Sequence, residues 1–230
     1  NRTQPAPLWN SVVADVSDFT WNDSSWMAER KKYDDRRQPV SIYETSLGQW
    51  KSGKELVAFA KEKGYTHVEL HPVMEFLEDG SDGYPTSAYF AVSTRYGTPA
   101  DFAALVDELH QVGIGVILDW SPAQFPRYAG GLEKFDGTPL YEVKDPEMAV
   151  HPMWGTMLYN YDSPMVMDFL ISNACFWLEV FHVDGLRMDD VDAMLYLDYG
   201  RKDGWTPNMY GSNENLQAIE FLKHLNSILK

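Results

Sequence analysis

Short apolar runs alternate with segments of helical periodicity along most of this chain. Runs typical of strands fall at residues 41–47, 66–70, 114–118 and 183–188. In the segments between and after them, apolar side chains recur every three or four residues, which predicts helices over residues 53–63, 99–112, 164–181 and 213–230. Since strand and helix alternate, the pattern predicts an α/β fold with a parallel sheet and crossover helices.

Two architectures fit this alternation, a doubly wound sheet and a barrel. No G-x-G-x-x-G sequence or phosphate loop follows any predicted strand, which argues against a doubly wound nucleotide-binding domain. Acidic residues stand at the ends of the third and fourth strands, Asp119 and Asp189, and loops at this rim carry the chemistry of (β/α)8 TIM barrels. Four β/α units would be the first half of such a barrel.

Residues 1–40 lack this alternation of strand and helix patterns. They mix Pro, Trp, Asp and Ser and then become charged over residues 29–37, a run typical of a solvated face. We expect an irregular linker or the tail of a preceding domain, packed by its Trp residues. The chain lacks an initiator Met and stops inside its last apolar-periodic segment, so we expect both ends to be cut from something longer.

Composition narrows the class of ligand. The net charge of −15 argues against nucleic acid as a partner, whereas 8 Trp, 13 Tyr and 11 Phe suit both core packing and stacking on sugar rings. A single cysteine, Cys175, excludes an internal disulfide and indicates a reducing cytoplasm. No apolar run is long enough to span a bilayer, so no membrane association is expected.

The fourth strand carries the candidate chemistry. Arg187 and Asp189 are two residues apart, so on a strand they would face the same side. A guanidinium beside a carboxylate keeps that carboxylate ionised, and an ionised carboxylate in a cleft can act as a nucleophile. The six histidines lack spacing such as H-E-x-x-H, so no metal site is expected, and Glu69 and Glu75 are interpreted as structural groups.

With these motifs the chain resembles the glycogen branching enzymes of the α-amylase superfamily of glycoside hydrolases. The resemblance covers about residues 8–230, and its motifs lie at residues 42–50, 64–75, 113–120, 125–126, 140–142, 151–156, 194–199 and 207–216. It implies that residues 41–230 form the N-terminal half of a catalytic (β/α)8 barrel. It also implies that residues 1–40 are a remnant of a carbohydrate-binding-like β-sandwich domain.

The resemblance also implies roles for individual residues. Asp189 matches the catalytic nucleophile, and Arg187 matches the arginine that keeps it ionised. Asp119 and Tyr84 match residues that hold the donor-site sugar. The implied hexosyltransferase cleaves an α-1,4-glucan by a retaining mechanism and transfers the segment to a 6-hydroxyl, forming an α-1,6 branch of glycogen. No cofactor is implied, and the implied partner is an α-glucan.

Several positions depart from the family. Gln124 stands where the family has a His on the donor-site sugar, and Asp82 and Pro85 replace Trp and Gln in the Tyr84 loop. Asp190 replaces a small apolar residue beside the nucleophile, and strand alternation predicts that it faces away. The family's acid/base Glu would lie beyond Lys230, so this chain alone is expected to show no turnover.

The departures keep two further readings open. One is another α-glucan activity of the superfamily, a hydrolase or a trehalose-releasing enzyme. The other is a non-catalytic glucan-binding homologue, which Gln124 and the altered Tyr84 loop motivate. The sequence does not determine an oligomeric state.

Overall fold

A computed structural model describes residues 2–3, 11–32 and 38–229. The chain divides into two compact units, which are described separately. The first unit contains residues 1–120 and 176–187, and the second contains residues 121–175 and 188–230. No helix within the described residues is long and apolar enough to cross a membrane.

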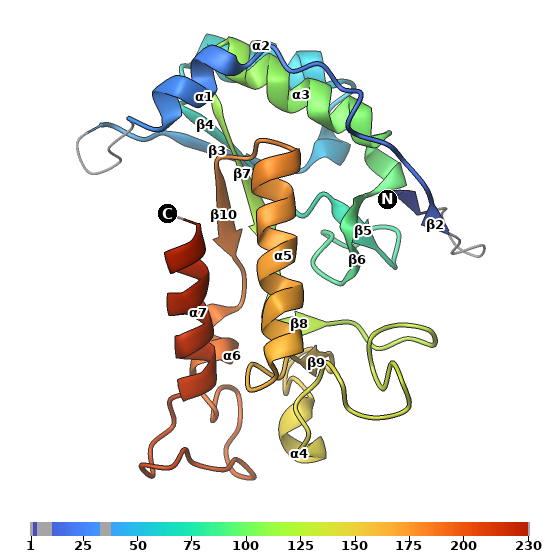
Figure 1. The fold of residues 1–230 in the computed structure, drawn as a ribbon, viewed down its shortest axis with the longest axis vertical. Helices are drawn as coiled ribbons and strands as arrows, with labels where there is room; N and C mark the ends of the chain where they lie inside the picture. The colour runs from blue at the N-terminus through green and yellow to red at the C-terminus, as the bar shows by residue number, and fades with distance from the viewer. Residues whose placement is uncertain (1, 4–10, 33–37, 230) are drawn as a thin grey trace. The chain divides into compact units, whose positions relative to one another are not determined.

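The first unit contains the strands of the main sheet and the helices beside it (Figure 1). Its elements, in chain order, are β1 (Arg2–Thr3), β2 (Ser11–Val12), α1 (Ser24–Arg30), β3 (Ile42–Thr45), η1 (Leu47–Gln49), α2 (Gly53–Lys63), β4 (His67–Leu70), β5 (Met74–Phe76), β6 (Thr86–Val92), η2 (Thr94–Tyr96), α3 (Pro99–Gln111), β7 (Gly115–Trp120) and β10 (Gly185–Met188), whose last residue belongs to the second unit.

The main sheet has the strand order β10-β7-β4-β3, and the β3/β4 and β4/β7 pairs are parallel. Alternation along β4 buries Val68 and Leu70 completely, while His67 and Glu69 lie half-buried on the opposite face. Along β4, one face is therefore apolar, and the other, here called the polar face, carries His67 and Glu69. The four strands predicted from the sequence are confirmed, with ends that differ by a few residues.

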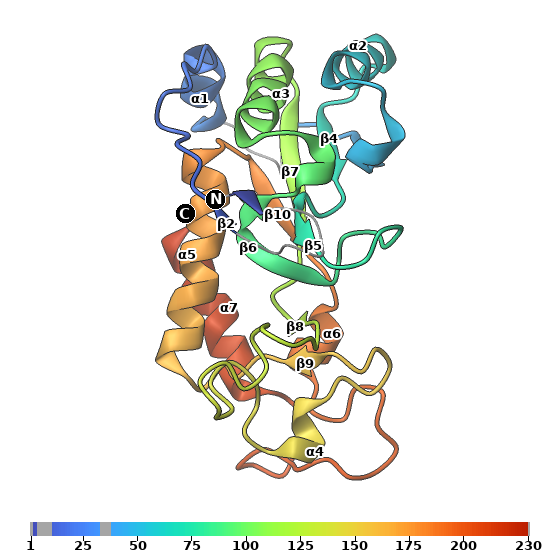
Figure 2. The ribbon, with the colours of Figure 1, turned by 90° about the vertical axis from the view of Figure 1, so that its right-hand side faces the viewer.

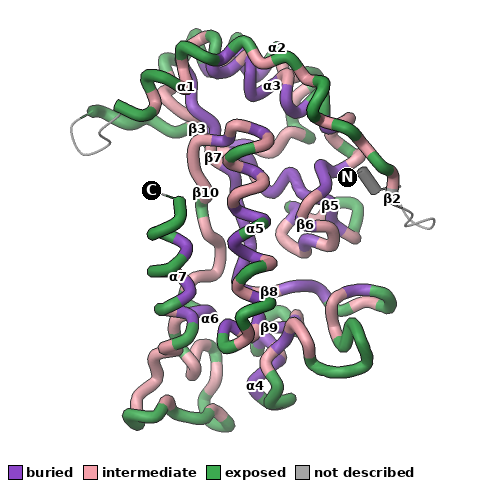
Figure 3. The backbone as a smooth tube through the Cα atoms, in the orientation of Figure 1, coloured by how far each residue is buried: buried purple, intermediate pink, exposed green. Residues whose placement is uncertain are grey.

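The helices α2 and α3 pack side by side next to this sheet (Figures 1 and 2). The Ser52 hydroxyl accepts the Glu55 amide at 3.3 Å and begins α2, which ends at Gly64 with φ of 73°. A capping box between Thr98 and Asp101 begins α3. Both helices bury an apolar stripe and expose their other sides, as Figure 3 shows.

Two segments differ from the predicted pattern. The irregular structure expected for residues 1–40 is wrong at residues 24–30, which form α1; Trp26 and Arg30 anchor this helix through contacts far along the chain. Residues 80–96, whose glycines and aromatic residues predict a loop, contain β6, which pairs antiparallel with β5. Register shifts on both sides of Glu75 break the period-2 pattern that would have indicated this hairpin.

Most of the second unit is loop, with short elements around two long helices. Its elements are β8 (Gln124–Phe125), α4 (Pro146–Ala149), β9 (Met157–Leu158), α5 (Pro164–Val180), α6 (Val191–Leu195) and α7 (Leu216–Ile228); the last turn of α5 belongs to the first unit. The long helix predicted from Pro164 is confirmed. Phe221 of α7 is fully buried and stacks on Tyr161 with ring centroids 5.2 Å apart.

Candidate functional site

Three of the predicted site residues meet in the first unit. Asp119 lies on β7 and is fully buried, and its Oδ2 atom accepts a hydrogen bond from the Tyr84 hydroxyl. Arg187 of β10 places Nη1 3.4 Å from the same carboxylate oxygen and 3.4 Å from the Tyr84 hydroxyl. A cationic, a phenolic and a carboxylate group, from three separate segments, thus converge near the carboxyl ends of neighbouring strands.

The loop that carries Tyr84 is held by local constraints. Gly83 has φ of 89°, and a Cβ atom there would lie 2.8 Å from the Pro72 carbonyl oxygen, so only glycine fits this turn. On the adjacent hairpin, the buried Glu75 carboxylate accepts from the Thr94 amide at 3.0 Å and pairs with Arg95. The structural role expected for Glu75 is consistent with these contacts.

Burial and neighbouring charges shift the pKa values of the carboxyl groups around Asp119. Burial raises the pKa of Asp119, while the Tyr84 hydrogen bond and the Arg187 charge oppose that rise. Glu69, on the same polar sheet face, also has a raised pKa, because of its burial and the neighbouring Asp119 and Glu44 carboxylates. The cluster therefore contains more carboxylates than cations.

Asp189 and Gln124 both lie in the second unit. Asp189 is the bend residue that follows β10, so its predicted placement on one side of a strand with Arg187 remains a prediction. Gln124 of β8 donates from Nε2 to Asp190 Oδ2 at 2.9 Å, and its Oε1 accepts from the Thr156 hydroxyl. Gln124 is therefore tied to the residue next to the candidate nucleophile.

A buried histidine approaches the same carboxylate. His151 Nε2 lies 2.9 Å from Asp190 Oδ2, and the side chain of His151 is fully buried. Its Nδ1 accepts from the backbone amides of Met153 and Trp154 at 3.2 Å each, which leaves the ring proton on Nε2, close to Asp190 but without the alignment of a hydrogen bond. Asp190 is thus enclosed by Gln124 on one side and His151 on the other.

The expected orientation of Asp190 by strand alternation is wrong. The strand ends at Met188, and Asp190 adopts a left-handed backbone conformation with φ of 57° and ψ of 36° just before α6. Its burial, followed by the Asp189 and Asp192 charges, raises its pKa from 3.8 to about 6. An aspartate in this place is strained in its backbone and unfavourable in its ionised form.

Replacing Asp190 by Asn is expected to stabilise the protein at neutral pH. The folded carboxyl holds its proton more tightly than the unfolded one, so its ionisation opposes folding increasingly as pH rises from about 4 and fully above about 6. Asn removes this charge, keeps an acceptor for Gln124 and tolerates the left-handed conformation. We expect a gain of about 2 kcal/mol in the free energy of unfolding at pH 7.5, measured by urea denaturation.

The same measurement at pH 4 should show a much smaller gain, because most of the native carboxyl is then protonated. Asp203→Asn is the matched control, since Asp203 is exposed. It should change the free energy of unfolding by less than about 0.5 kcal/mol at either pH. An equal gain for Asp190→Asn at both pH values would contradict the electrostatic explanation and leave only the backbone effect.

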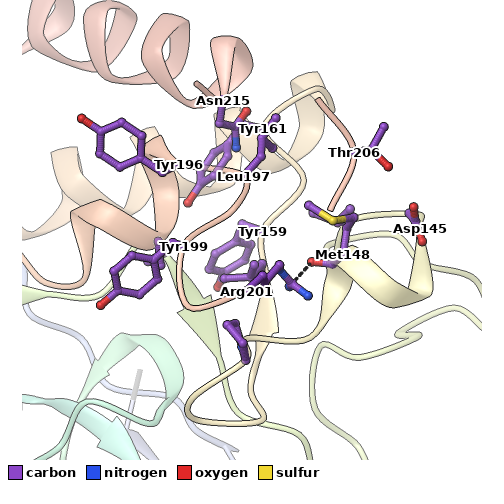
Figure 4. Close-up of a pocket in the computed structure, with 15 residues that line it drawn as sticks. Asp145, Met148, Tyr159, Tyr161, Tyr196, Leu197, Tyr199, Arg201, Thr206 and Asn215 are labelled. Atoms are coloured by element: carbon purple, nitrogen blue, oxygen red, sulfur yellow. Dashed lines mark hydrogen bonds between the residues drawn. The ribbon is translucent and has the colours of Figure 1, made fainter. Parts of the chain in front are cut away.

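The second unit also contains a cavity of about 280 Å³ (Figure 4). Its wall includes Tyr159, Tyr161, Tyr196 and Tyr199. Arg201 lies at the wall, but its guanidinium donates to the carbonyl oxygens at the end of α4, for example to Val150 at 2.6 Å. The cavity is thus lined by tyrosine rings and aliphatic side chains, and its arginine holds the α4 segment.

Sequence reasoning missed two groups in these sites. His151 makes the Asp190 contact across 39 residues, and no local motif connects the two positions. Glu44 and His71 lie with Asp119 on the polar sheet face, where one ligand atom from each falls within 4.8 Å of the others. The signal that could have found them is the parallel alignment of strand ends, rather than spacing along the sequence.

The sequence is similar to known enzymes of one family. Residues 20–122 match the family described as alpha amylase, catalytic domain. The chain is 49% identical to the 1,4-alpha-glucan branching enzyme GlgB of Methylococcus capsulatus, covering 97% of this chain and 32% of that protein. It is 50% identical to the GlgB of Thermobifida fusca, covering 98% of this chain and 31% of that protein.

A solved structure is also similar to this chain. A crystal structure from Salmonella typhimurium, assigned as an alpha amylase, matches with a TM-score of 0.66 and 28% sequence identity, covering 80% of this chain and 30% of that one. The fold is accordingly that of the first β/α units of a (β/α)8 barrel. The chain spans about a third of the length of the curated relatives it matches.

Proposed function

Because part of this chain matches the alpha amylase catalytic domain and nearly all of it is similar to branching enzymes, we propose that it belongs to the α-amylase family and forms the nucleophile-bearing part of a 1,4-α-glucan branching site. The observation that carries the proposal is the convergence of Tyr84, Asp119 and Arg187 near the ends of parallel strands. A buried carboxylate with an adjacent phenol suits the hydroxyls and ring face of a sugar. The similarity to branching enzymes along nearly the whole chain supports this assignment.

In the proposed reaction, the Asp189 carboxylate attacks the anomeric carbon of an α-1,4-linked glucose. The bond to the leaving glucan breaks, and that glucan's oxygen takes a proton from a separate carboxylic acid. A 6-hydroxyl of a second glucan then attacks the glycosyl ester, loses its proton to the same acid/base group and releases Asp189. Arg187 keeps Asp189 ionised, and Asp119, Tyr84 and Gln124 bind the donor sugar.

The rest of the chain fits the same proposal. Residues 41–230 would supply the first half of the catalytic barrel, and residues 1–40 would be the tail of a preceding β-sandwich domain. The single cysteine, Cys175, supports a cytoplasmic location. The substrate class is a neutral α-glucan, in keeping with the abundance of aromatic residues and the net charge of −15.

Covalent trapping tests the nucleophile directly. A ring-fluorinated α-maltosyl fluoride carries a leaving group that departs without protonation, so labelling requires the nucleophile and the sugar site but no acid catalyst. We expect the polypeptide that carries this chain to gain one maltosyl ester, located by peptide mass spectrometry on Asp189. Asp189→Asn should abolish the label, while Asp192→Asn, a matched change nearby on α6, should keep it.

Product analysis separates the alternatives. New α-1,6 linkages in amylose indicate branching, whereas free short sugars or trehalose indicate a hydrolase. Glucan binding without labelling at Asp189 would instead support a non-catalytic homologue, which Gln124 and the altered Tyr84 loop favour. A label on any residue other than Asp189 would overturn the proposed mechanism.

A further inference from the structure

Three side chains able to bind metal gather on the polar face of the main sheet. Glu44 lies on β3, Asp119 lies on β7, and His71 follows β4, the strand between them (Figure 1). The parallel register pairs Thr45 with Leu70 and Leu70 with Leu118, so His71 and Asp119 fall on the next rung. One ligand atom from each residue lies within 4.8 Å of the other two.

Two atoms at this place have unused bonding capacity. The Oδ2 atom of Asp119 accepts from Tyr84 and Arg187, but no cation or N–H donor among the described residues reaches its buried Oδ1 atom, and the Glu69 carboxyl lies against Asp119. His71 Nε2 lies 3.1 Å from Glu44 Oε1, and its Nδ1 atom is buried without a partner in the same part of the chain. A buried carboxylate oxygen that faces no donor is costly, and a cation would remove that cost.

The local charge also favours a cation. Glu44, Glu69 and Asp119 bring three carboxylates to this face, and Arg187 supplies one guanidinium, on the Oδ2 side of Asp119. A divalent ion at the Oδ1 side would neutralise the remaining negative charge without displacing Arg187.

We propose that Glu44, His71 and Asp119 bind a divalent transition-metal ion of the zinc class. One imidazole nitrogen and two carboxylate oxygens form a three-ligand set that zinc accepts, with a fourth position for water. Around zinc, ligand atoms stand about 3.4 Å apart, so small rotations of the exposed Glu44 side chain would complete the site. The imidazole disfavours magnesium and calcium, which prefer oxygen ligands alone.

This site goes beyond the proposed glucan activity and does not depend on it. Asp119 would belong to both sites, because Tyr84 and Arg187 hold one of its oxygens and the metal would take the other. Metal and donor sugar would consequently compete at Asp119. This last consequence, inhibition of branching by bound zinc, rests on the proposed function, whereas the metal site itself does not.

Metal titration without glucan tests the inference. We expect one Zn²⁺ to bind per chain by calorimetry, and one Co²⁺ to give visible absorption bands typical of low coordination number. His71→Asn and Glu44→Gln should each weaken Zn²⁺ affinity at least about tenfold. His224→Asn is the matched control, because His224 is exposed on α7 and should leave the affinity unchanged.

Both site variants are needed because His71 is partly buried and Glu44 is exposed. Far-UV circular dichroism checks their folding, and Glu44→Gln keeps the test decisive if His71→Asn misfolds. Absence of Zn²⁺ binding, or binding that both variants retain at full strength, would overturn the metal site. Neither result would touch the glucan proposal, which the trapping of Asp189 tests separately.

Discussion

Replacing Asp189 by Asn is expected to reduce glucan branching at least about a thousandfold. An amide cannot form the glycosyl ester, whereas its size and shape leave the surroundings intact. The measurement uses the whole polypeptide that carries this chain. The rate is followed by the spectral shift of iodine-stained amylose, and α-1,6 linkages are counted in the product.

Asp192→Asn provides the control for this loss. Asp192 lies in the first turn of α6, three residues from Asp189, and the change again removes one negative charge. Its branching rate should stay within a few-fold of the unaltered protein. If Asp189→Asn keeps more than a tenth of the original rate while folding normally, Asp189 is not the nucleophile.

Replacing Asp184 by Ala is expected to lower the free energy of unfolding by about 3–5 kcal/mol. The buried Asp184 carboxylate accepts from Trp26 Nε1 at 2.8 Å and Arg30 Nη1 at 3.1 Å. Its other oxygen accepts from the Val116 amide at 2.7 Å and lies 2.9 Å from His110 Nε2. Alanine would leave the Trp26 indole and the Val116 amide without this acceptor, whereas Arg30 keeps two backbone carbonyl oxygens.

His110 makes the loss larger. Its side chain is fully buried, and its second nitrogen lies 2.9 Å from Asp23 Oδ2, so carboxylates flank both sides of the ring. Removing Asp184 would therefore leave the Nε2 atom of this buried ring without its carboxylate partner.

The stability lost in Asp184→Ala should depend on pH. Burial opposes the ionisation of Asp23 and Asp184, but the surrounding hydrogen bonds and charges, those of the histidines foremost, together lower the pKa of both from 3.8. A lowered folded pKa adds stability above the ordinary value and loses it as pH falls through the folded value. The difference between the protein and Asp184→Ala, followed by urea unfolding, should be full at pH 6 and shrink below about pH 4.

Asp203→Ala serves as the exposed control, with an expected change under about 0.5 kcal/mol. A loss below about 1 kcal/mol for Asp184→Ala would mean that water replaces the carboxylate, and that the cluster contributes little. Trp26 fluorescence offers a local readout, because this indole is one of the donors to Asp184.

The sequence predicted the elements whose pattern is local. The strands at His67–Leu70 and Gly115–Trp120, and the helix from Pro164, follow from periodicity and helix-start signals that neighbouring residues supply. The hairpin of β5 and β6 could not be predicted in this way, because its bulges break the alternation. The helix α1 could not be predicted either, because the Trp26 hydrogen bond that anchors it goes to Asp184, more than a hundred residues away.

The candidate site, too, could be predicted only where the pattern is local. Asp119 and Arg187 could be singled out because each stands on a strand that periodicity defines, near its carboxyl end. Their contact could not be derived without knowing that β7 and β10 are neighbours. Asp190 was placed wrongly because alternation was extended past Met188, where the strand ends and the backbone becomes left-handed.

The anchoring of α1 has a consequence for the order of folding. Trp26 and Asp184 are 158 residues apart, and that loop must close before their hydrogen bond can form. During synthesis, α1 can therefore form this hydrogen bond only after Asp184 has left the ribosome. In refolding experiments, burial of Trp26 should be among the slowest phases, later than the closure of the local β5–β6 hairpin.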